Sequence, residues 1–480
     1  MFHLTHLPAS GRVDIGLNYF CNQYKTIIFA KYYNKYSILL VTSNKNIFKI
    51  TYPIFLTLVA QNIINVTDTA FLGRVSEVAL GASAIAGVFY FAVYMIGFGF
   101  SQGAQILIGR RNGEKNYSQI GPIFNNSLLF NFLIACFIFI ISYLYVPDLM
   151  RKLVSSEHVY KATIEYLDWR IYGFFFGFIN VIFRAFFVGI TDTKVLTTSA
   201  IITALVNIIL DYVLIFGKFG CPELGIAGAA IASVIAEAVT LLYLIFHTFA
   251  FVDIKKYDLF THIKPEIKTI YPILNLSIFI MFQYFISIST WFLFFIFIER
   301  MGERPLAVTN IGRSMYILLM IPAAALSTTA GTLVSNMIGA GSKQDILKTV
   351  NKIIRIALLL VTPLLIFTFI FPELFARIYT NDSSLMLASI SVIRVVSVAV
   401  TFFAVSNVII NAVSGTGSTK IAFFIEIITL FFYISYVYYT AIINPQSVAI
   451  VWLSEFIYWI IIGGLGYLYL WKGDWRRKKF

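Results

Sequence analysis

The stretch PIFLTLVAQNIINVTDTAFLG, residues 53–73, decides the fold, because it is long, mostly apolar and carries a single charged side chain, Asp68. A helix needs about 20 apolar residues to cross the roughly 30 Å of hydrocarbon in a bilayer. Backbone groups surrounded by lipid must bond within their own segment, so an apolar run of this length forms a helix. The stretch therefore predicts a transmembrane helix.

The composition of the whole chain is also typical of a membrane protein. Of its 480 residues, 59% are hydrophobic and 12% are charged, and the mean hydropathy is +0.83. Soluble globular chains average about 45–50% apolar and about 25% charged residues. We expect an all-α polytopic membrane protein with twelve transmembrane helices. The expected spans are 47–72, 80–108, 122–146, 163–188, 195–217, 225–250, 269–298, 306–338, 350–371, 385–413, 421–442 and 447–471.

The net charge of +13 is distributed in the pattern of a membrane protein. Most of the 36 Lys and Arg residues fall in alternate loops and in the two tails, and cytoplasmic segments carry such an excess. This pattern predicts a multi-pass inner-membrane protein with both termini in the cytoplasm, whose partner is the lipid bilayer and not nucleic acid. Cys21, Cys136 and Cys221 share no metal-ligand spacing, so we expect no zinc site and no cofactor.

An internal repeat divides the twelve runs into two halves. At an offset of 226 residues, Gly113 aligns with Gly339 and Lys194 aligns with Lys420. Each half has an even number of spans, so the halves enter the membrane from the same side and are related by a pseudo-two-fold axis along the membrane normal. Two six-helix bundles that face each other enclose a central cleft. This favours a transporter over a channel or a scaffold that grew by duplication.

The repeat and the charged segments set the predicted domain boundaries. We expect an N-terminal six-helix bundle at 47–252, a cytoplasmic linker at 253–268, a C-terminal bundle at 269–471 and a basic cytoplasmic tail at 472–480. Residues 1–46 are interpreted as an N-terminal extension outside the core, with an amphipathic segment on the inner membrane surface as the alternative. The protein is expected to be a monomer.

Three polar residues share one face of the first span, because helical spacings separate Gln61, Asn65 and Asp68. A carboxylate at the membrane centre costs roughly 2.5–3.5 kcal/mol on insertion scales, so such a face is expected to line a cleft. The alternatives are contact between helices or an interfacial cap near Arg74. Pro53 in the same span permits a kink and is a candidate hinge, although a proline also commonly begins a helix.

A second polar face lies on the fifth span, where Asn207 and Asp211 are one helical turn apart. Ser233 on the sixth span adds a hydroxyl. Carboxylate, amide and hydroxyl oxygens suit a proton or a hard cation, and a hydrogen-bonded pair between helices is the alternative. Under the repeat, Asn207 and Asp211 align with Tyr433 and Val437. The second half lacks these acids, so we expect ion coupling in the N-terminal bundle.

Other intramembrane charges have no assigned role. Glu237 lies in the middle of its span, whereas Glu426 and Glu455 lie near span ends, where we expect them to reach water. Arg313 and Arg394 also lie within spans. A membrane-embedded enzyme would need a Ser/His or His/Asp/Glu constellation at one membrane face, and the sequence presents none, so we do not expect an enzyme.

Six segments, in their order and spacing, resemble motifs of the multidrug and toxic compound extrusion (MATE) family, and the resemblance covers about residues 47–470. It implies an antiporter that exports bulky, often cationic organic compounds in exchange for inward H⁺ or Na⁺. The segments are Pro53–Gly73 ending TDTAFLG, RAFFVGITDTK at Arg184–Lys194, VNIILD at Val206–Asp211, GIAGAAIAS at Gly225–Ser233, TLVSNMIGAG at Thr332–Gly341 and SGTGSTK at Ser414–Lys420.

The resemblance also implies site residues. The first-half cation site of one family branch maps to Asp68, Asn207, Asp211 and Ser233, where serine replaces a threonine and keeps the hydroxyl; Na⁺ would bind at the first three. Another branch places an acid in the seventh helix, where this chain has Gln283.

The expected substrate cavity comprises Gln61, Asn65, Asn180 and Gln283. Of these, Gln61 and Asn180 correspond to a first-helix glutamine and a fourth-helix asparagine of the family's drug cavity.

The expected mechanism begins when Asp68 captures a proton or Na⁺ from outside. The first helix then repacks about Pro53, and the outward cleft releases its substrate. The nearest alternative is a flippase for a lipid-linked oligosaccharide, from the same wider superfamily. It would need a basic cleft for pyrophosphate, for which Arg184, Arg313 and Arg394 are the candidates.

Overall fold

A computed structural model describes residues 43–154, 156–261, 265–380 and 382–476. The chain divides into two units, Met1–Phe48 and Lys49–Phe480, and the helical bundles belong to the second. Most of the predicted extension, residues 1–42, lies outside the described residues. The described part is helical and contains no β-strand, so the predicted all-α class is confirmed.

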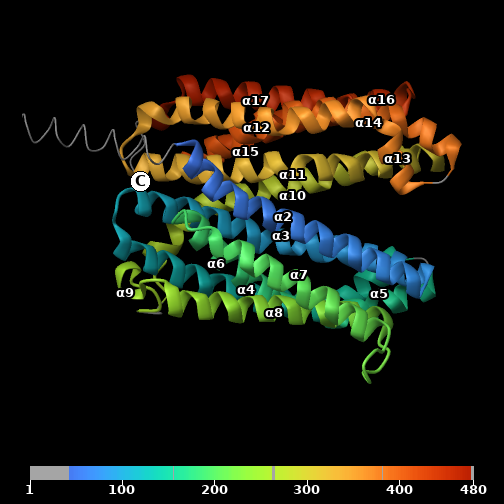
Figure 1. The fold of residues 1–480 in the computed structure, drawn as a ribbon, viewed down its shortest axis with the longest axis horizontal. Helices are drawn as coiled ribbons and strands as arrows, with labels where there is room; N and C mark the ends of the chain where they lie inside the picture. The colour runs from blue at the N-terminus through green and yellow to red at the C-terminus, as the bar shows by residue number, and fades with distance from the viewer. Residues whose placement is uncertain (1–42, 155, 262–264, 381, 477–480) are drawn as a thin grey trace, which may run out of the picture. The chain divides into compact units, whose positions relative to one another are not determined.

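The helices of the first half follow the predicted spans closely (Figure 1). Short connections separate them, and a small helix, α9 (Ile254–Tyr257), lies in the predicted linker. The long helices are α2 (Asn44–Val75), α3 (Glu77–Gly113), α4 (Ile120–Leu153), α5 (Glu157–Arg170), α6 (Gly173–Gly189), α7 (Lys194–Ile215) and α8 (Gly225–Phe251).

The second half repeats this pattern, with a π-helical turn at Tyr439–Ile443 that extends α15. Short 3₁₀ turns occur at Tyr117–Gln119, Lys343–Asp345 and Asp474–Arg476. The helices are α10 (Ile267–Glu299), α11 (Glu303–Gly339), α12 (Ile346–Ile370), α13 (Pro372–Tyr379), α14 (Ser383–Gly415), α15 (Thr419–Tyr438), α16 (Val448–Val451) and α17 (Ser454–Lys472).

The number of membrane spans agrees with the prediction of twelve. Eleven described helices are long and apolar enough to cross a membrane, and the pair α5 and α6 makes a twelfth that is bent by 52°. The predicted span at 163–188 is thus present, as a broken helix rather than a continuous one. A side chain at Gly173 would come within 2.8 Å of the Glu237 carboxylate, so glycine at the break leaves room for a polar cluster.

Within each half, the helices pack into a bundle. In the first half, α3 packs against α5 and α6, and α7 packs against α8. In the second, α14 packs against α11, α12 and α17, and Figure 1 shows α12, α14 and α17 running side by side. The two bundles meet where α3 contacts α10 and α11.

The joint between α3 and α11 carries the predicted pseudo-symmetry. Gly113 packs onto the backbone carbonyl of Asn336, and Gly339 packs onto the backbone carbonyl of Arg110. Gly113 and Gly339 are equivalent under the 226-residue offset, and so are Arg110 and Asn336. Reciprocal contact between equivalent residues is what a two-fold axis produces. The axis predicted from the repeat therefore passes through this crossing.

Candidate coupling and substrate sites

The carboxyl groups of Asp68 on α2 and Asp211 on α7 lie within hydrogen-bonding reach of each other. Asp211 is fully buried and Asp68 is partly buried. Among the described residues, no donor bonds either oxygen of Asp211 or the Oδ1 atom of Asp68. Two ionised carboxylates can only accept hydrogen bonds, so the pair is stable at this distance when it shares a proton or a cation.

Asn207 and Ser233 complete this group of predicted coupling residues. Asn207 is 1% exposed and precedes Asp211 by one turn of α7. Its Nδ2 atom donates to Ser233 Oγ on α8 at 3.4 Å, while its Oδ1 atom has no donor in the described part of the chain. The structure thus brings the four predicted residues into one cluster of carboxyl, amide and hydroxyl oxygens. Their roles in coupling stay a prediction.

Transition-metal ions are usually bound by several His, Cys, Asp or Glu side chains that converge on one point. Within the described ranges, no group of three or more His, Cys, Asp and Glu side chains is arranged to hold a metal ion. A Na⁺ ion at Asp68, Asn207 and Asp211 would therefore draw on amide oxygen as well as on the two carboxylates.

A buried ion pair lies beside the acidic cluster and explains how the carboxyl group of Glu237 is stabilised in the middle of its span. Arg170 Nη2 bonds Glu237 Oε1 at 2.6 Å, and the guanidinium lies 3.6 Å from the centre of the Tyr90 ring. The Tyr90 hydroxyl donates to Glu237 Oε2 at 3.2 Å. Arg170 is also close enough to Asp68 to interact with it electrostatically. This pair was not predicted from the sequence, although two opposite charges inside apolar spans are expected to pair with each other.

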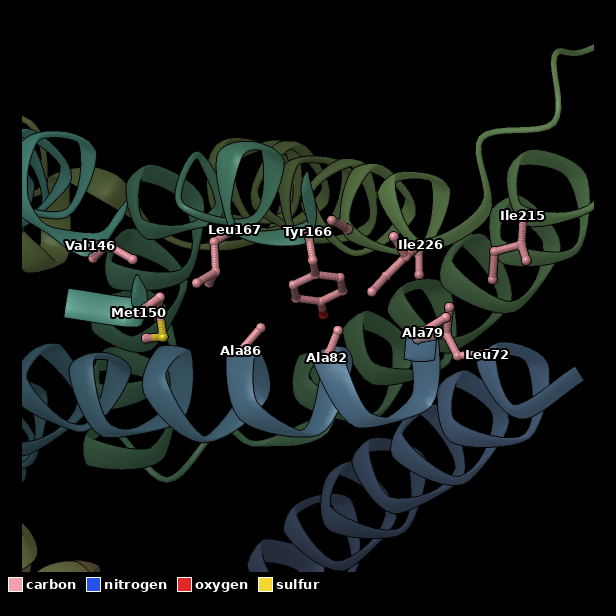
Figure 2. Close-up of a cluster of buried hydrophobic side chains, with 12 residues drawn as sticks. Leu72, Ala79, Ala82, Ala86, Val146, Met150, Tyr166, Leu167, Ile215 and Ile226 are labelled. Carbon is pink, nitrogen blue, oxygen red and sulfur yellow. The ribbon is translucent and has the colours of Figure 1, made fainter. Parts of the chain in front are cut away.

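An apolar cluster packs beside the acidic pair (Figure 2). Leu72 and Ile215 belong to it, and each follows its acid by one helical turn, on α2 and α7. Figure 2 shows the Tyr166 ring of α5 reaching toward Ala82 of α3. Tyr166 interacts electrostatically with both Asp68 and Asp211. The cluster therefore excludes water from this side of the two acids.

Pro53 lies in the interior of α2, not at its first residues. A proline cannot donate to the carbonyl four residues earlier, here that of Lys49. The Thr193 hydroxyl contacts the Lys49 carbonyl at 3.4 Å and donates to the Ile50 carbonyl at 3.1 Å. The interpretation of a proline that merely begins the span does not apply, and the hinge stays a prediction.

The four residues predicted for the substrate cavity occupy different environments. Gln283 lines a cavity of about 220 Å³ between α3 and the helices of the second half. Gln61 and Asn65 are exposed on α2, and neither lines that cavity. Asn180 donates through Nδ2 to the backbone carbonyl of Glu237 at 2.9 Å, which joins α6 to α8. The structure therefore does not bring these four residues together.

The cavity also contains Glu426, which was expected to reach water. Glu426 is 1% exposed and Glu455 is 4% exposed, so that expectation is wrong. Glu455 accepts bonds from the Tyr316 hydroxyl at 2.6 Å and from Trp459 Nε1 at 3.0 Å. Neighbouring helices supply neutral hydrogen-bond donors to both carboxyl groups in place of water.

Three intramembrane arginines do not form a common basic cleft around this cavity. Arg184 lies 5.2 Å from the Phe98 ring centre, and none of the three arginines is among the residues that line the cavity. Arg313 lies over Phe295 and Arg394 lies over Phe369.

Buried acids and a polar cavity within twin six-helix bundles define an α-helical membrane transporter. A family model described as MatE matches residues 53–213 and 268–439. The chain therefore belongs to the MatE family, whose members are transporters and not enzymes.

Relatives and solved structures agree with this assignment. The chain is 27% identical over 382 residues to a protein named probable multidrug resistance protein NorM from Thermotoga maritima, covering 78% of this chain and 80% of the relative. It is 30% identical over 197 residues to the probable multidrug resistance protein YoeA of Bacillus subtilis, covering 40% and 42%.

A solved outward-facing multidrug resistance MATE family transporter matches with a TM-score of 0.83 at 17% identity, covering 92% of this chain and 99% of that one. The eukaryotic MATE transporter AtDTX14 matches with a TM-score of 0.81 at 18% identity, covering 92% and 98%. At these identities, the similarity shows the shared fold.

Proposed function

We propose that this protein is a secondary active antiporter that exports bulky, often cationic organic compounds in exchange for inward H⁺ or Na⁺. Asp68, Asn207, Asp211 and Ser233 form the coupling site. The observation that carries the proposal is the approach of the Asp68 and Asp211 carboxyl groups without any donor to Asp211 among the described residues. The multidrug resistance names of the relatives support the class of cargo.

The acidic pair gives a reason for α2 to move when the ion binds or leaves. With a proton or Na⁺ between them, the carboxyl groups attract each other. Without it, two negative charges in a dry site repel each other, and that repulsion is strong at low dielectric. Asp68 sits on α2 and Asp211 on α7, so loss of the ion drives the two helices apart. An ion that binds one arrangement better than the other shifts the population between them.

A kink at Pro53 lets α2 bend when Asp68 and Asp211 move apart, without disrupting the rest of the bundle. Thr57 Oγ1 bonds the Pro53 carbonyl at 2.9 Å and the Leu196 carbonyl at 3.2 Å, so the region next to the proline is tied to α7. Separation of Asp68 from Asp211 then bends the far part of α2 about this tie.

The distribution of basic residues supports an orientation of the chain in the membrane. The excess of Lys and Arg in alternate loops supports both termini in the cytoplasm of a bacterial-type inner membrane. The protein then works as a monomer that takes its ion from outside and its organic cargo from the cytoplasm.

A flippase for a lipid-linked oligosaccharide fits the site less well. Its pyrophosphate group would need converging basic side chains. The lining of the cavity that the structure describes contains one carboxyl group, from Glu426, and no Lys or Arg. This charge favours a positively charged cargo over an anionic one.

The test uses purified protein in liposomes loaded with ethidium. A pure pH gradient and a pure Na⁺ gradient are imposed in separate experiments, and efflux is followed by fluorescence. We expect one gradient to drive efflux in the wild type and Asp68→Asn to abolish that dependence. Asp148→Asn, at an exposed position of α4, is the matched control and should transport normally. Undiminished gradient-driven efflux by Asp68→Asn would refute the coupling role.

A further inference from the structure

Glu426 on α15 is a buried carboxyl group that the coupling site does not use. Its Oε1 atom accepts hydrogen bonds from Ser287 Oγ and from the Tyr458 hydroxyl, both at 2.6 Å. Its Oε2 atom accepts a longer bond of 3.3 Å from Gln283 Nε2. Two short bonds from hydroxyl donors are the geometry of bonds to an ionised carboxylate. These three donors can therefore stabilise a negative charge on Glu426.

No positive side chain balances this charge within the cavity. The lining residues that the structure describes include no Lys, Arg or His. An isolated buried charge is costly, and proteins normally pair it. Oε2 is the oxygen with the weaker bond, and Glu426 itself is part of the cavity wall. A positively charged ligand in the cavity would supply the missing partner.

The remaining walls distinguish an organic cation from a bare metal ion. The aromatic rings of Tyr284, Tyr458 and Trp459 line the cavity, and ring faces attract cations. Amide groups of Gln102 and Asn411 supply polar contacts from α3 and α14. At about 220 Å³, the cavity is larger than the tight shell of oxygens that Na⁺ prefers. Such a mixture of rings, amides and one acid suits a flat or bulky ammonium compound.

We propose that this cavity, which α3 and the second bundle line, binds the positive charge of an organic ammonium ligand at Glu426. The inference deepens the proposed export function and rests on it for the biological role of the ligand. It assigns cargo binding to an acid in the second half of the chain, separate from ion coupling at Asp68 and Asp211 in the first half. Ser287 and Tyr458 are positioning residues that hold the carboxylate toward the ligand.

The test measures equilibrium binding without any gradient, so it can fail independently of the transport proposal. Ethidium, which is cationic, is compared with phenanthridine, its uncharged parent ring, on purified full-length protein. We expect Glu426→Gln to weaken ethidium binding at least about tenfold while phenanthridine binding stays within about twofold. Glu426→Asp, which keeps the charge, should retain part of the ethidium affinity.

Two control variants separate this site from other acids. Glu373→Gln removes an exposed acid of the second half, on α13, that does not line the cavity, and it should bind ethidium as the wild type does. Asp148→Asn, which removes an exposed acid of the first half that lies outside the cavity lining, should also keep its ethidium affinity. A wild type that binds ethidium through Glu426 but responds to no gradient would contradict the antiport proposal alone.

A chemical measurement on the unmodified chain covers the case in which Glu426→Gln does not fold. Dicyclohexylcarbodiimide reacts with the protonated form of acids in apolar surroundings, so labelling is carried out at a mildly acidic pH at which Glu426 is labelled in the absence of ligand, and mass spectrometry locates the label. Ethidium should protect Glu426 from labelling, whereas phenanthridine should not. Equal labelling of Glu426 with and without ethidium overturns the proposal. So does a folded Glu426→Gln variant that binds ethidium as tightly as the wild type.

Discussion

Gly113 and Gly339 occupy equivalent positions in the two repeats, and each packs directly onto a backbone carbonyl of the helix that carries the other. A backbone carbonyl inside a helix cannot move aside for a new methyl group. The crossing of α3 and α11 therefore requires glycine at both positions.

We predict that Gly113→Ala and Gly339→Ala each destabilise the folded protein by about 1–3 kcal/mol, the usual cost of overpacking. The measurement is thermal unfolding of purified protein in detergent. Gly464→Ala is the control, because a side chain at Gly464 on α17 would meet nothing within 4 Å. That change should be neutral or slightly stabilising. Unchanged melting temperatures for both crossing variants would contradict the close packing.

The Arg170–Glu237 pair should be important for stability because both side chains are largely buried, with exposures of 11% and 19%. Glu237→Gln leaves the guanidinium without its counter-charge, and breaking a buried pair in this way costs about 3–5 kcal/mol. The double variant Arg170→Met with Glu237→Gln should recover part of the loss. Glu157→Gln, in an exposed pair with Lys161, should change stability by less than about 1 kcal/mol. Thermal unfolding distinguishes these outcomes.

Pro53→Ala tests the hinge in α2. Alanine restores an amide donor toward the Lys49 carbonyl and favours a continuous helix. We expect gradient-driven efflux to slow severalfold while equilibrium ethidium binding and melting temperature stay close to those of the wild type. Pro272→Ala, at an exposed position in α10, is the control and should not slow efflux. Equal rates for Pro53→Ala and wild type would exclude a hinge at this residue.

Asp382 caps α14 and provides a pH-dependent prediction outside the membrane-spanning segments. Its carboxylate accepts bonds from the backbone N–H groups of Ser384 at 2.8 Å and Leu385 at 3.4 Å, and these bonds lower the pKa of Asp382 below its ordinary value of 3.8. A lowered pKa in the folded state means that the carboxylate stabilises the fold above that ordinary value. The stabilisation is lost as the pH falls below 3.8 through the lowered pKa.

We therefore expect Asp382→Ala to lower the melting temperature at neutral pH and to differ less from the wild type at strongly acidic pH. Asp382→Ser keeps a capping oxygen without a titratable group, so its effect relative to alanine should not depend on pH. The readout is the melting temperature of the three proteins as a function of pH. A constant difference between the wild type and the Asp382→Ala variant across this range would contradict the role of the carboxylate.

The features that were predictable from the sequence are those that depend on local pattern or on the repeat. Apolar run length gave the spans, and the offset that aligns Gly113 with Gly339 gave the axis that their reciprocal contacts confirm. The helical spacing of Asn207 and Asp211 placed them on one face of α7, and Asp68 meets that face. These predictions needed little knowledge of distant contacts.

The features that were missed depend on side chains from distant segments. The bend between α5 and α6 accompanies a cluster in which Glu237 on α8 and Tyr90 on α3 meet Arg170. In the sequence, Glu426 is an acid near a helix end. The structure shows that Ser287 of α10 and Tyr458 of α17 bond its carboxyl group. A sequence gives each residue's position on its own helix, but it does not give the rotation of one helix against another.

The α3–α11 joint also has a mechanical consequence. Its contacts, including Gln105 with Thr332 and Asn112 with Asn336, occupy the last turns of both helices. The earlier part of α3 extends about 40 Å beyond the joint, given a rise of about 1.5 Å per residue. A rotation of about 10° there sweeps the far end through about 7 Å, on the same rise per residue. If the proposed transport cycle turns the two halves about the glycine crossing, a small rotation there is enough to separate the distant helix ends by the width of a substrate.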